Sequence, residues 1–146
     1  MLARQRWDVL GYVIAFQGWL LCERGLLDAA GERFDLMQDL LASTAPQSIH
    51  IVRCLTLRGR YLRLIREHST AMSVLTEARE LASSGGAAYK VGHIDCEIAA
   101  LANDMGDRLR AQVLLDRAQR LCEILACEDR SWLGRGVIEV ASMLSR

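Results

Sequence analysis

The sequence has almost no proline, no net charge and no long apolar run, and each absence excludes a class of protein. Its single proline is Pro46, and 18 lysines and arginines balance 18 aspartates and glutamates. Proline disrupts helix interiors, so its rarity, together with plentiful leucine, alanine, arginine and glutamate, predicts helix throughout. A net charge of zero provides no general attraction to nucleic acid or to a membrane surface. We therefore expect no direct nucleic-acid contact from this chain.

No segment is suited to a membrane or to export. No run reaches the roughly 18 apolar residues of a membrane span, and Asp8 and Gln17 interrupt the first apolar stretch, so we expect no signal peptide. The cysteines are odd in number and lie within helical patterns: Cys22, Cys54, Cys96, Cys122 and Cys127. A disulfide scaffold would be rich in loops, so reduced thiols and a cytoplasmic location are expected.

Motifs for catalysis or metal binding are also missing. His50, His68 and His93 have no partner at metal-ligand spacing, and neither His-Glu-x-x-His nor Cys-x-x-Cys occurs. The glycine pair at residues 85–86 lacks the lysine and the strand of a phosphate loop, so it is interpreted as a turn. We predict no metal, no cofactor and no enzymatic activity. A cysteine–histidine nucleophile that meets only in space stays an open alternative.

What the sequence does contain is a repeat of about 40 residues. In each copy a small residue precedes a large one by four positions, and two further positions share the period. The alanines are Ala30, Ala71 and Ala111, separated by 41 and then 40 residues. The large residues are Phe34, Leu75 and Leu115; three positions later come Met37, Ala78 and Ala118; twelve before each alanine lie Gly18, Gly59 and Ala99. A fixed period of this length indicates stacked helical hairpins.

The repeat divides one domain, residues 1–146, into three hairpins and a last helix. The expected repeats span residues 3–45, 47–86 and 87–127, with breaks at Gly25, at Pro46, at Gly85-Gly86 and at Gly106. Ser69 or Thr70 is expected to cap the fourth helix. The terminal helix, residues 129–146, is expected to be unpaired and to expose an apolar face of Leu133, Val137, Val140 and Leu144. Such a face predicts a homodimer or a contact with a neighbouring domain.

The small and large positions resemble those of the tetratricopeptide repeat (TPR). HEAT and armadillo repeats have a period closer to 40 residues. However, they commonly use helix-bending prolines, and Pro46 is the only proline of this chain. The chain departs from the TPR pattern in its longer period, in the missing proline at the repeat ends, and at Gln17 and Arg58, where leucine is preferred. Long, degenerate repeats of this kind resemble those of bacterial transcription regulators of the MalT/LuxR type. The resemblance implies a right-handed superhelix that forms part of a larger protein.

In TPR-like arrays the first helix of each hairpin lines a concave groove, and the resemblance implies these groove residues here: Tyr12, Trp19, Arg53, Arg60, Arg63, His93 and Asn103. The three arginines share one helical face. Two hypotheses for these arginines stay open. In the first, they bind an anionic ligand. In the second, they pair with acidic residues of the first helix of the next hairpin, such as Asp95 and Asp104.

From this architecture we expect a non-catalytic protein-interaction module of a LuxR/MalT-type regulator, with a protein or peptide partner or neighbouring domains of the same chain. The alternative is a domain that senses a small anionic effector in the groove.

Overall fold

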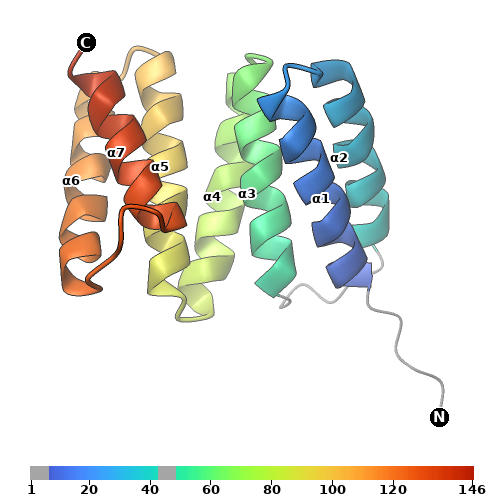
Figure 1. Ribbon diagram of the computed structural model, residues 1–146, viewed down its shortest axis with the longest axis horizontal. Helices are drawn as coiled ribbons and strands as arrows, with labels where there is room; N and C mark the ends of the chain where they lie inside the picture. Colours follow the sequence, from blue (N-terminus) through green and yellow to red (C-terminus); the bar gives the residue numbers. More distant parts are fainter. Residues whose placement is uncertain (1–6, 43–48) are drawn as a thin grey trace.

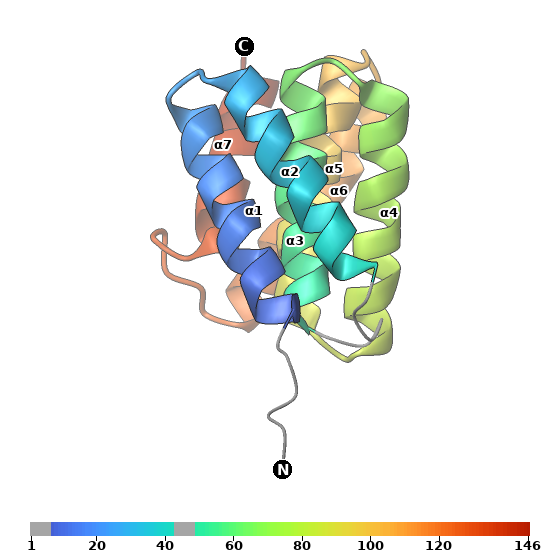
Figure 2. The same ribbon diagram turned by 90° about the vertical axis from the view of Figure 1, so that its right-hand side faces the viewer.

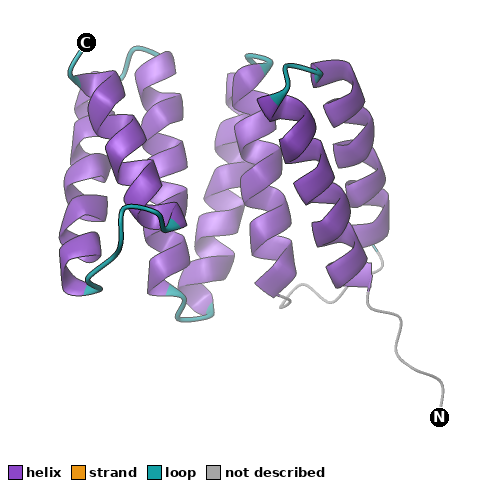
Figure 3. Cartoon of the chain, viewed as in Figure 1, coloured by secondary structure: helices purple, strands orange, loops and turns teal. Residues whose placement is uncertain are grey.

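The computed structural model describes residues 7–42 and 49–146, and all regular structure in these ranges is helical (Figure 3). The helices are α1 (Trp7–Glu23), α2 (Leu27–Leu41), α3 (Ile49–Leu64), α4 (His68–Ser84), α5 (Ala88–Asp104), α6 (Arg108–Ile124) and α7 (Trp132–Leu144). Three antiparallel hairpins form from α1 and α2, α3 and α4, and α5 and α6. The all-α prediction of three hairpins and a C-terminal helix is confirmed. The break expected at Pro46 lies outside the described residues.

The hairpins stand side by side in a single array (Figure 1). Helix α1 packs on α3, and α4 packs on α5, so each hairpin contacts the next. Helices α1 and α7 lie on the same side of the array, as Figures 1 and 2 both show. We call the surface that α1, α3, α5 and α7 present on this side the inner face. No helix within the described ranges is both long and apolar enough to cross a membrane.

The 40-residue period is visible in the backbone of the turns. Gly25, Arg66 and Gly106 each adopt a left-handed conformation, with φ of 73°, 65° and 83°. In each turn the next amide donates to a carbonyl five residues earlier; the pairs are Leu26 to Leu21, Glu67 to Leu62 and Asp107 to Ala102. This backbone closure satisfies the helix end. Arg66 therefore occupies a position where glycine stands in the other two hairpins.

The turn between α3 and α4 corrects one prediction. Helix α4 begins at His68, and Glu67 at its N-cap makes no side-chain capping bond, so the expected cap by Ser69 or Thr70 is wrong. Because the turn is tight, α4 begins before Ser69 and Thr70, so both lie within its first turn. The break at Gly85-Gly86 is confirmed, because α4 ends at Ser84 and Gly86 has a φ of 68°.

The repeat positions form the core. The three key alanines are fully buried, and Phe34, Leu75 and Leu115 are at most 3% exposed. Gly18 faces Phe34, where an added Cβ would lie 2.9 Å from Cε2, and Gly59 faces Leu75 even more closely. The glycines thus let paired helices approach, as the sequence pattern predicted.

Helix α7 has no hairpin partner of its own, as predicted, but its apolar face is covered, which overturns the expectation of an exposed face. It packs against α5 and α6, and Leu133, Val140 and Leu144 are 0%, 2% and 6% exposed. It begins at Trp132, and Ser131 caps it by accepting from the Gly134 amide at 3.0 Å. The Arg108 guanidinium donates to the Leu144 carbonyl at its other end. The reason is that α7 folds back onto the inner face of the last hairpin, so the homodimer contact loses the apolar face from which it was inferred.

Candidate ligand-binding site on the inner face

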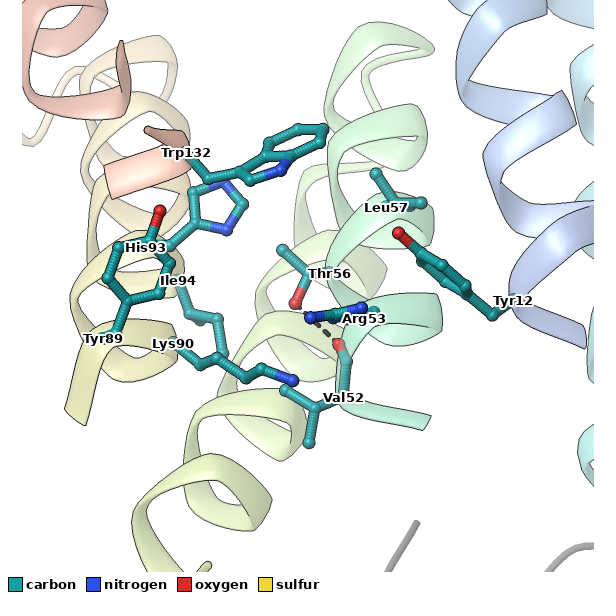
Figure 4. Close-up of a pocket in the computed structure, with 10 residues that line it drawn as sticks. All are labelled: Tyr12, Val52, Arg53, Thr56, Leu57, Tyr89, Lys90, His93, Ile94 and Trp132. Carbon is teal, nitrogen blue, oxygen red and sulfur yellow. Dashed lines mark hydrogen bonds between the residues drawn. The ribbon is translucent and has the colours of Figure 1, made fainter. Parts of the chain in front are cut away.

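A cavity of about 160 Å³ opens on the inner face, among α1, α3, α5 and α7. Figure 4 shows the side chains that line it: Tyr12, Val52, Arg53, Thr56, Leu57, Tyr89, Lys90, His93, Ile94 and Trp132. Among the described residues, the lining contains no aspartate or glutamate. Thr56 is buried and donates its hydroxyl hydrogen to the Val52 carbonyl at 2.7 Å, so its donor is already used. The open polar groups are therefore supplied chiefly by the basic side chains.

The structure brings together only part of the predicted groove. Tyr12, Arg53 and His93 line the cavity, whereas Trp19, Arg60, Arg63 and Asn103 do not. Sequence reasoning missed Tyr89, Lys90 and Trp132. The first two lie one turn before His93 on the same helix, so helical spacing could have found them. Trp132 could not be placed, because it depends on how α7 folds back.

A chain of aromatic rings follows the inner face beside the cavity. The ring centroids of Tyr12 and Phe16 lie 6.5 Å apart, and those of Phe16 and Trp19 lie 5.4 Å apart. Trp19 then meets Trp132 edge to face at 5.6 Å, and Trp132 meets His93 at 5.5 Å. The tryptophan pair joins α1 to α7 across the inner face, since the two helix backbones make no contact of their own.

Beyond the tryptophan pair, Arg60 is held by three carboxylates from three helices. Its guanidinium lies 3.4 Å from Glu97 of α5, 3.6 Å from Glu139 of α7 and 3.9 Å from Glu23 of α1. Burial lowers the pKa of Arg60, but the three glutamates outweigh that effect and raise it. Arg60 does lie on the inner face, as expected, yet its charge is already neutralised within the chain.

The next arginine on this face is neutralised as well. Arg63 donates to Asp104 of α5 at 3.0 Å. Asn103, beside Asp104, is partly buried and lies away from the cavity. Asp95 does not pair with the inner arginines, because it is 1% exposed and binds Arg79 of α4 at 2.6 Å. Internal pairing is therefore correct for Arg60 and Arg63, with Asp104 rather than Asp95 as one of the partners.

His93 connects the two parts of the inner face. Its ring is 16% exposed, and its Nε2 lies 3.8 Å from a Glu97 oxygen. Burial lowers the pKa of His93, Glu97 raises it, Arg60 lowers it, and the net shift is downward. The imidazole is therefore mostly neutral at pH 7, and a neutral ring can both donate and accept a hydrogen bond.

Two basic side chains line the cavity, the exposed Arg53 and the half-buried Lys90, and neither pairs with a carboxylate of the described residues. The Lys90 ammonium nitrogen is buried and has no hydrogen-bond partner in the described structure. Burial, and secondarily the nearby Arg53, lowers its pKa to about 8. The Arg53 guanidinium lies over the Tyr12 ring, 5.4 Å from its centroid. Figure 4 shows both side chains directed into the same space between α3 and α5. This end of the inner face thus carries positive charge that no carboxylate of the lining offsets.

Four cysteine thiols in the described part of the chain have raised pKa values. Burial raises the pKa of Cys22 and Cys122 to about 11 and that of Cys54 to about 12. Cys96, also buried, shifts in the same direction. Thiols with such pKa values stay protonated at pH 7 and are poor nucleophiles. No cluster of three or more His, Cys, Asp or Glu side chains there has the geometry to hold a metal ion.

Comparison with known proteins adds no family to this geometry. The chain matches no protein-family model, and no curated protein or solved structure is significantly similar to it. The architecture of paired antiparallel helices is consistent with helical-hairpin repeats.

Proposed function

We propose that this chain is a non-catalytic binding module of TPR-like hairpins that recognises an anionic partner on its inner face. The observation that carries the proposal is the cavity, whose described lining has two basic side chains, Arg53 and Lys90, and no acidic residue. Elsewhere on the same face the chain supplies carboxylates for Arg60 and for Arg63. A buried cation without a partner is costly, so a site that keeps one is suited to a ligand that brings negative charge.

The regulatory setting is part of the proposal and rests on the resemblance of the repeat. In regulators of the MalT/LuxR type, such an array lies between an ATPase module and a DNA-binding domain, and neighbouring domains of the same chain are then candidate partners. The coding sequence on either side of this segment tests this setting. An ATPase module upstream and a helix-turn-helix downstream support it, and flanking sequence of any other kind contradicts it.

A second candidate is a sensor of a small anionic effector, and one contact favours it. Trp19 and Trp132 meet at 5.6 Å and bridge the inner face beside the cavity. An extended peptide that lies along this face has to part the two rings, whereas a small molecule that fills the cavity does not. The cavity, about 160 Å³, is also below the usual 300–1,000 Å³ of sites for drug-sized ligands.

The binding function is tested by NMR on the ¹⁵N-labelled chain. A blocked hexapeptide of alternating Glu and Phe is one probe, its Gln-for-Glu analogue is the matched control, and benzoate is the small-molecule probe. We expect shift changes on the inner-face residues of α1, α3, α5 and α7 with at least one acidic probe, and about tenfold weaker binding of the neutral peptide. Changes confined to α2, α4 and α6, or no changes with either acidic probe, would contradict the proposal.

A further inference from the structure

The cavity supports a more specific assignment, which rests on the proposed function. We propose that it is a binding site for a small carboxylate with a flat apolar body, an arylcarboxylate being the simplest member of the class. The carboxylate lies between Arg53 and Lys90, and the ring lies toward Trp132 and Tyr12.

The basic end of the cavity fixes the charge of the ligand. Arg53 of α3 and Lys90 of α5 point into one space, and the buried Lys90 nitrogen has three donors and no acceptor. A carboxylate has two oxygens, so it can accept from both side chains at once. Such a bond removes the cost of burying the ammonium group unsatisfied.

The remaining walls fix the body of the ligand. Apart from Thr56, whose hydroxyl is already bonded, they are apolar or aromatic and include Val52, Leu57, Ile94 and the rings of Tyr12 and Trp132. Inorganic phosphate has no apolar surface to place there, and acetate has very little. A flat ring fits both the walls and their aromatic edges, because rings pack favourably against each other at offset or edge-on angles.

The volume fixes the size. The cavity measures about 160 Å³, and an apolar cavity of about 150 Å³ is large enough to hold benzene. A single ring with one carboxylate therefore matches the space, whereas most of a nucleotide or an oligosaccharide would lie outside it. The tryptophan bridge between α1 and α7 limits extension of the ligand along the inner face.

The test is isothermal titration calorimetry of the full chain with benzoate. Benzyl alcohol lacks the charge, acetate lacks the ring, and inorganic phosphate is an anion without an apolar body. We expect each of the three to bind at least about tenfold more weakly than benzoate. Lys90→Met and Arg53→Met are expected to weaken benzoate by the same factor, whereas Arg33→Met, at an exposed position on α2, leaves it unchanged.

Proton uptake provides a readout that belongs to Lys90. The groups around its ammonium are Arg53 of α3, Tyr12 of α1, and Tyr89 and His93 of α5, and none of them is acidic. A bound carboxylate raises the lowered pKa of Lys90, so at pH 8 binding takes up a few tenths of a proton, by order of magnitude. The measured heat then depends on the ionisation enthalpy of the buffer. This dependence is expected to disappear in Lys90→Met.

The outcomes separate this inference from the proposed function. If the acidic peptide shifts inner-face resonances but benzoate does not bind, the small-carboxylate assignment is wrong and the binding module stands. If neither probe affects the inner face, both are wrong. Benzoate binding that survives both Arg53→Met and Lys90→Met, or phosphate binding as tight as benzoate, overturns the assignment of this cavity or of its ligand class. Thermal melts of each variant verify that the chain is folded.

Discussion

The two ends of the inner face carry the same kind of side chain in opposite electrostatic settings. At one end, Arg60 and Arg63 are within 4.0 Å of four carboxylates, those of Glu23, Glu97, Glu139 and Asp104. At the other end, Arg53 and Lys90 line a cavity in which no described residue is acidic. Arg53, Arg60 and Arg63 belong to one helical face of α3, so the helix itself does not distinguish them.

The difference comes from what the neighbouring helices place opposite each arginine. Glu97 and Asp104 are on the later turns of α5, and Glu139 is on α7, whereas the first turn of α5 contributes Tyr89 and Lys90. An arginine row in a sequence therefore does not identify a binding site by itself. The informative part of the row is the basic residue that the fold leaves without an acidic neighbour.

The largest expected effect on stability comes from displacing α3, which carries Arg53 of one end and Arg60 and Arg63 of the other. Gly59 lies against Leu75, with no room for a side chain between α3 and α4. Gly59→Leu is expected to lower the free energy of unfolding by about 3 kcal/mol, because overpacking forces neighbouring side chains from their rotamers. Urea denaturation followed by circular dichroism measures this change.

Gly85→Ala is the matched control for that experiment. A Cβ at Gly85 would meet the Leu81 carbonyl oxygen at 3.4 Å, an ordinary contact. The free energy of unfolding of this control should lie within about 0.5 kcal/mol of the parent's, as is usual for surface substitutions. A Gly59→Leu protein as stable as the control would show that the close approach of α3 and α4 does not hold the inner face in place.

The second prediction compares the two ends by reversing one charge in each. Arg60→Glu places a fourth carboxylate among Glu23, Glu97 and Glu139, and we expect a loss of about 2 kcal/mol. This expected loss is smaller than the roughly 3–5 kcal/mol that it costs to break a fully buried ion pair, because Glu23 and Glu139 are half exposed. Arg53→Glu removes a cation from beside Lys90 and should leave the stability unchanged or slightly higher. Equal losses in urea denaturation would mean that the two ends do not differ electrostatically.

Much of the fold was predictable, because the same local pattern recurs three times. Small residues at Gly18, Gly59 and the key alanines predict where paired helices touch, and these positions are buried. Turn glycines at residues 25 and 106 mark two hairpins, but Arg66 hides the third, since the backbone takes the same left-handed turn without a glycine. Here the period, rather than the residue type, locates the turn.

The site was less predictable, because it depends on contacts between helices that are far apart in the sequence. The resemblance to TPR-like repeats placed Tyr12, Arg53 and His93 on the inner face, where the structure has them. It could not show that Glu139 of α7 reaches Arg60, since the sequence does not reveal that the last helix folds back. The same fact hid Trp132. An amphipathic terminal helix has an apolar face in either case, and only packing decides whether the chain itself covers it.

The smallest expected effect concerns the basic end alone and depends on pH. The pKa of Lys90 is lowered from 10.5 in the unfolded chain to about 8 in the folded one. Below pH 8 the group is protonated in both states, and folding bears the full cost of burying its charge. Between pH 8 and 10.5 the folded chain releases this proton first, so Lys90 contributes a rise in stability with pH over that window.

Lys90→Met should therefore be more stable than the parent at pH 7. The expected difference is about 1 kcal/mol, since partial exposure of the side chain screens part of the effect. The advantage should shrink toward zero by pH 10.5, and the cysteine thiols, which titrate in the same range, are common to both proteins and cancel in the difference. Urea denaturation of both proteins at pH 7, 9 and 10.5 measures the difference. If Lys90→Met is less stable than the parent at pH 7, the ammonium group has a stabilising partner, and the contrast between the two ends fails at this residue.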